Sequence, residues 1–141
     1  MTKVEESKRL LLSALQGEFR ACIAAQNIAE FYSVATSQVA YPLATAKAAD
    51  IARALTNSAA LRTIYEADES FREIFAWIEA GGRDPDAGPW IHDCRLAFAA
   101  KANGIRIILT ENVDDFGDFE FIEAINPFGK DRVQGPTANE N

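Results

Sequence analysis

The stretch Ile91–Phe116, IHDCRLAFAAKANGIRIILTENVDDF, decides the fold class of this chain. Asp93 stands at the start of a helical pattern that ends at Gly104, which is expected to adopt a left-handed conformation. A β-branched run from Ile105 to Leu109 follows, typical of a strand buried on both faces, and then a loop with further acidic residues. A helix, a strand and an acidic loop in this order predict one repeat of an α/β fold.

The rest of the chain continues this alternation. Helical spacing is found at Glu5 to Gln16, Gln26 to Thr36, Thr45 to about Asn57, and Ser70 to Ala80. Strand-sized apolar runs lie at Phe19 to Ala24, Leu61 to Tyr65, and Phe121 to Ile125. We therefore expect an α/β fold with a mostly parallel sheet, formed by one domain over residues 1–128. The polar tail at 129–141 is expected to be disordered.

Some details of these elements can also be predicted. Thr45 is a candidate N-cap for the third helix. The composition of Gly81 to Pro89, GGRDPDAGP, indicates a loop. The amphipathic helix from Ser70 to Ala80 is expected to bury four apolar side chains, those of Phe71, Ile74, Phe75 and Ile78.

Polar residues are expected to come together where two consecutive strand–helix repeats of the predicted sheet meet. In an open parallel sheet, ligands bind at the edge formed by the carboxyl ends of the strands and the starts of the next helices. Asp93 and the group Asn112, Asp114 and Asp115 are therefore expected at one crevice. Carboxylates brought together repel one another unless a cation neutralises them, and oxygen ligands suit Mg²⁺ or Mn²⁺. The sequence predicts a metal site.

Composition narrows the chemistry further. The 141 residues include 21 acidic and 14 basic side chains, a net charge of −7, which disfavours a sequence-independent nucleic-acid coat but suits a basic partner. Cys22 and Cys94 lack metal-ligand spacing and are expected to be reduced packing residues. With a single histidine, His92, carboxylates are the available ligands. Without a membrane-length apolar run or a signal peptide, a cytoplasmic protein is expected.

Three segments together resemble the PIN-domain proteins of the VapC-type toxin branch. They hold Glu30 in QNIAEFYSVAT, Asp93 in IHDCRLAFAAKANG, and Asn112 with Asp115 in LTENVDDF, and the INPF at 125–128 resembles the family's closing strand. The resemblance implies a three-layer α/β/α fold and a Mg²⁺- or Mn²⁺-dependent ribonuclease that cleaves RNA. It also implies a homodimer that an antitoxin protein holds inactive.

The resemblance also implies roles for single residues. Glu30 corresponds to the helix glutamate that contacts the metal directly or through water, and Asp93 to the central metal-binding aspartate. Asp115 corresponds to the aspartate that closes the motif. Asn112 and Thr110 match residues that support the site.

The chain departs from the family pattern at one point. Family members open with an apolar strand ending in Asp-Thr-Asn, which supplies a central strand and the first metal-binding aspartate, and this chain contains no such motif. The fold is therefore expected to lack that strand. Either the true start lies upstream of Met1, or the chain is a degenerate, catalytically inactive relative retained for dimerisation or partner binding.

Ordinary structural roles compete with each assignment. Asp93 suits the first turn of any helix, Glu30 can be a solvated acid, and Asn112 can form a turn. Asp115 is preferred to its neighbour Asp114 as the site residue, because adjacent side chains rarely enter one site together. Three basic residues could contact phosphate or be plain surface charges: Arg95, Lys101 and Arg106. An unrelated α/β regulatory domain with these acids on its surface is a third possibility.

Overall fold

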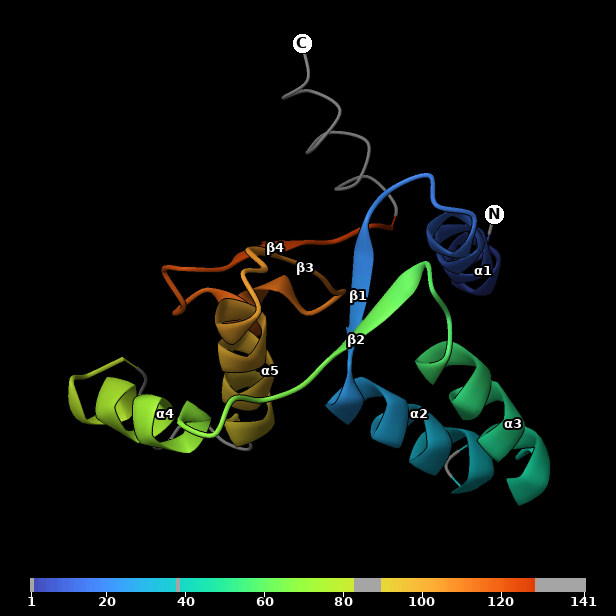
Figure 1. Cartoon of the computed structure of the whole chain (residues 1–141), viewed down its shortest axis with the longest axis horizontal. Helices are drawn as coiled ribbons and strands as arrows, with labels where there is room; N and C mark the ends of the chain where they lie inside the picture. Colours follow the sequence, from blue (N-terminus) through green and yellow to red (C-terminus); the bar gives the residue numbers. More distant parts are fainter. Residues whose placement is uncertain (1, 38, 83–89, 129–141) are drawn as a thin grey trace, which may run out of the picture. The chain divides into compact units, whose positions relative to one another are not determined.

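The computed structural model describes residues 2–37, 39–82 and 90–128 (Figure 1). Helices alternate with short strands that pair in parallel, so the prediction of an α/β class is confirmed. The chain divides into two compact units, residues 1–65 and 66–141. The predicted tail at 129–141 and most of the predicted loop, residues 83–89, lie outside the described residues.

The first unit contains three helices and one parallel strand pair within its described residues. The elements are α1 (Lys3–Leu15), β1 (Ala21–Ala24), α2 (Ala25–Ser37), α3 (Thr45–Thr56) and β2 (Leu61–Ile64). The strands β1 and β2 run parallel, with Ala21 opposite Leu61 and Ala24 opposite Ile64. Helix α2 follows β1 without a loop and packs against α3 (Figure 1).

The ends of α1 are fixed by its own sequence. The Glu5 amide donates to Thr2 Oγ1 at 3.2 Å, and the Thr2 amide donates to Glu5 Oε2 at 2.8 Å, which together form a capping box. After the helix, Gly17 adopts a φ of 77°, a conformation that glycine enters at little cost. Both termini of α1 are therefore encoded locally.

The prediction that Thr45 caps α3 is wrong by one position. The N-cap is Ala44, whose side chain cannot accept a hydrogen bond, and Thr45 is the first helical residue. Ala48, the residue whose amide donates to the Ala44 carbonyl at 3.0 Å, is fully buried. Burial of the Ala48 side chain, and not a side-chain cap, therefore stabilises the start of α3.

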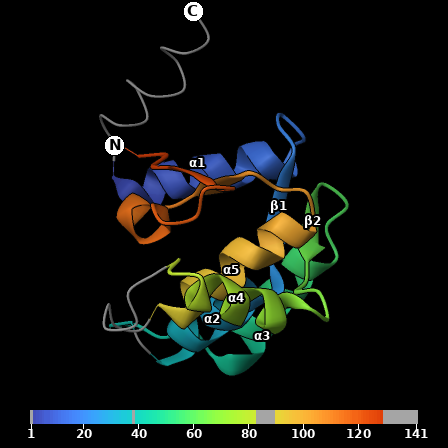
Figure 2. The same cartoon turned by 90° about the vertical axis from the view of Figure 1, so that its left-hand side faces the viewer.

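The second unit contains α4 (Ser70–Glu79), α5 (Ile91–Ala102), β3 (Ile107–Leu109), the 3-10 helix η1 (Val113–Phe116) and β4 (Glu123–Ile125). The strands β3 and β4 run parallel, with Ile107 opposite Glu123 and Leu109 opposite Ile125. Helix α4 lies against α5 (Figure 2). Gly104, with a φ of 72°, ends α5 in the predicted left-handed conformation.

An aromatic core holds the second unit together. The Phe119 side chain is almost completely buried, and its ring stacks on Trp77 with 4.7 Å between centroids. The Phe98 ring from α5 meets the Phe121 ring at 5.0 Å, and the fully buried Ile74 of α4 joins the same cluster. This packing connects α4, α5 and the segment between η1 and β4.

Two burial predictions are wrong. On α4, Ile74 is buried as expected and Ile78 is half-buried, but Phe71 and Phe75 are 48% and 53% exposed, because the helix turns its Ile74 and Trp77 side toward the core. Strand β3 is not buried on both faces either. Ile108 faces the core, whereas its neighbours Ile107 and Leu109 point away from it and are exposed.

Two further observations bear on the expectations from composition. Cys94 is fully buried and Cys22 is partly buried, and neither of these two cysteines forms a disulfide, as predicted. None of the helices in the described ranges has both the length and the apolar character that a membrane crossing requires.

Candidate functional site

Asp93 lies in the first turn of α5, where the sequence predicted it. The residue is half-buried, and the N-cap of the helix is Trp90, whose side chain makes no capping hydrogen bond. A carboxylate at this position is stabilised by the positive end of the helix dipole. The next turn buries Cys94, Ala97 and Phe98 in the aromatic core, so the backbone that carries Asp93 is firmly placed.

The loop after β3 is organised by hydrogen bonds among the other predicted site residues. The Thr110 amide donates to the Ile125 carbonyl at 3.0 Å, and the Thr110 hydroxyl accepts from the Asn112 amide at 3.0 Å. The Asp115 amide donates to the Asn112 carbonyl at 3.1 Å. Phe116, which is buried, anchors η1 in the core. Thr110, Asn112 and Asp115 therefore form one ordered turn.

This turn comes back toward the helix that carries Asp93. The chain reverses at Gly104 and runs along β3, and η1 then contacts α5. Asp115 is half-buried in this turn, whereas Asp114 and Asn112 are exposed. The preference for Asp115 over Asp114 as the site residue stays a prediction.

A complete metal cage is not formed by the described residues. Glu30 is an exposed residue of α2 in the first unit, whereas Asp93 and Asp115 belong to the second. In the part of the chain that the structure describes, no three histidine, cysteine or acidic side chains are grouped closely enough to hold a metal ion. Mg²⁺ is nevertheless often held by only one or two carboxylates, together with water and substrate phosphates. The donor types of Asp93 and Asp115 suit that mode.

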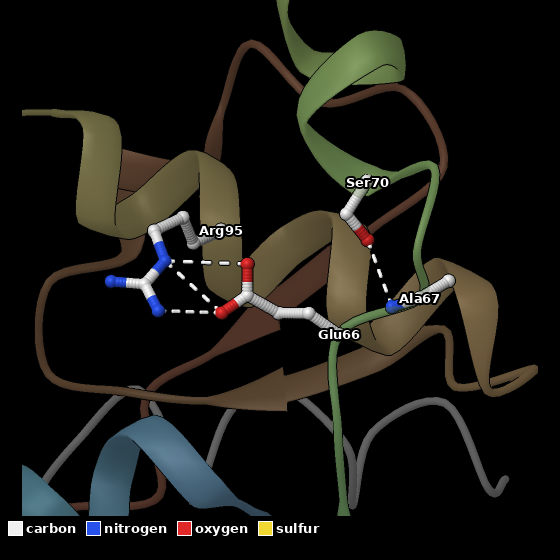
Figure 3. A network of polar contacts seen from close by, with 4 residues as sticks. All are labelled: Glu66, Ala67, Ser70 and Arg95. Carbon is white, nitrogen blue, oxygen red and sulfur yellow. Dashed lines mark hydrogen bonds and ion pairs between the residues drawn. The ribbon is translucent and has the colours of Figure 1, made fainter.

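The structure also reveals an ion pair that the sequence did not predict. Arg95 donates from Nη2 to Glu66 Oε1 at 2.5 Å, and from Nε to the same oxygen at 3.1 Å (Figure 3). Both side chains are about a quarter to a third exposed. The pair joins α5, two residues after Asp93, to the segment that precedes α4. No local pattern could reveal it, since 29 positions separate the partners.

The three basic residues that could contact phosphate are not equivalent. Glu66 holds Arg95, and Glu73 holds Lys101 at 3.5 Å while the Lys101 ammonium also lies 5.1 Å from the Phe121 ring centre. Arg106 is exposed beside β3. The side chains of Arg95 and Lys101 thus already make contacts within the second unit.

Comparisons with known proteins do not identify a family. The sequence matches no protein-family model, and neither the curated proteins nor the solved structures contain a match to it.

Proposed function

We propose that this chain is a ribonuclease of the PIN class that requires Mg²⁺ or Mn²⁺. The observation that supports the proposal is the pair of carboxylates in the second unit: Asp93 lies in the first turn of α5, and Asp115 lies in the turn that returns to that helix. The order of these acids, with Glu30 upstream, is the basis of the resemblance to VapC-type toxins. The proposal includes the family's three-layer fold, a homodimer and inhibition by an antitoxin.

Each residue has a role in this proposal. Asp93 and Asp115 supply carboxylate oxygens to the cation. By the family resemblance, Glu30 corresponds to a third ligand that contacts the metal directly or through water. The Thr110 hydroxyl, which accepts from the Asn112 amide, keeps the turn in position, and Asn112 orients water or a phosphate oxygen. A bound divalent cation supplies charge neutralisation at the phosphate and an activated water.

Cleavage of RNA tests this function directly. Fluorescently labelled single-stranded RNA, incubated with the protein and Mg²⁺ or Mn²⁺, should be cut, and chelation should stop the reaction. Asp93→Asn and Asp115→Asn should each abolish cleavage. Asp114→Asn is the matched control, because its side chain is exposed next to Asp115 and should leave the rate unchanged. Cleavage that persists in Asp93→Asn would rule the proposal out.

A non-catalytic PIN-like protein is the second candidate. It is favoured by the lack of a group of three potential metal ligands among the described residues, and by the lack of an Asp-Thr-Asn motif in the sequence. Calorimetric titration with Mn²⁺ separates the candidates. Metal binding that disappears in Asp93→Asn supports the enzyme, whereas no binding by a folded protein supports the non-catalytic relative.

A further inference from the structure

We draw no further inference here: the strongest candidate, the surface patch that the half-exposed side chains of Phe71 and Phe75 form on α4, is an apolar face, and nothing in the described part of the chain shows what covers it.

Discussion

Glu66 and Arg95 are joined across 29 positions of the chain by hydrogen bonds to both carboxylate oxygens, from Arg95 Nη2 to Glu66 Oε1 at 2.5 Å and from Arg95 Nε to Glu66 Oε2 at 3.3 Å. The arginine belongs to α5, and the glutamate precedes α4 by four residues. Bidentate pairing of this kind fixes the relative orientation of the guanidinium and the carboxylate as well as the distance between them. The pair therefore holds the first half of α5, including the turn with Asp93, against the beginning of the second unit.

Breaking this pair should destabilise the protein measurably. Both side chains are mostly removed from solvent, so Arg95→Met leaves the Glu66 carboxylate without its partner, at a cost of about 1–3 kcal/mol. Urea unfolding of Glu66→Gln, Arg95→Met and the double variant measures the coupling. Asp50→Asn, which removes the exposed ion pair with Arg53, should change stability by less than about 0.5 kcal/mol. A coupling energy near zero for Glu66 and Arg95 would contradict the structural role.

The aromatic core gives a second prediction. Phe119→Ala removes a ring that is almost fully buried and stacked on Trp77, so it should cost about 3–5 kcal/mol. Thermal unfolding followed by tryptophan fluorescence measures this loss, and Phe119→Leu should retain the fold with a smaller loss. Phe75→Ala, on the exposed side of α4, should cost less than about 0.5 kcal/mol. Similar losses for Phe119→Ala and Phe75→Ala would mean that the core is placed incorrectly.

Gly104 gives a third prediction, which concerns the backbone. A Cβ at this position meets no atom within 4 Å, so the cost of Gly104→Ala arises from its φ of 72° and should be about 1 kcal/mol. Gly104→Asn should cost less, since asparagine tolerates this conformation better. Gly117→Ala is the control, because Gly117 has a φ of −66° and an added Cβ would lie 3.5 Å from the Asp114 carbonyl oxygen, an ordinary van der Waals contact. Chemical denaturation should therefore give a lower free energy of unfolding for Gly104→Ala than for Gly117→Ala.

The capping box of α1 predicts a dependence on pH. Backbone and side-chain hydrogen bonds from Thr2 hold the pKa of Glu5 below its ordinary value. Its contribution to stability is therefore present above the ordinary glutamate pKa, and is lost as the pH falls through the lower folded-state value. Circular dichroism should show that helix content declines over this acidic range, and Glu5→Gln should remove that part of the decline. Glu6→Gln keeps the capping box and should behave like the wild type.

The order of helices and strands could be predicted from the sequence because the signals are local. Helical spacing, short β-branched runs and the glycine at 104 each depend on neighbouring residues only, and the observed elements lie close to their predicted bounds. The order of Asp93, Thr110, Asn112 and Asp115 likewise placed the last three in the turn after β3. Errors in these bounds, such as the cap of α3, were limited to one or two positions.

The tertiary structure decided which side chains are buried and which residues contact one another. The apolar stripe of α4 is wider than the surface that α5 and the aromatic core can cover, so the sequence could not tell that Ile74 is buried and Phe75 exposed. The Arg95 side chain could have met a phosphate, and only the fold brings Glu66 to it. A cluster of three metal ligands likewise requires side chains from distant segments to converge. The sequence by itself determined which acids the chain can offer and on which elements they stand, whereas only tertiary packing decides which of them meet, because contacts between distant segments leave no local pattern.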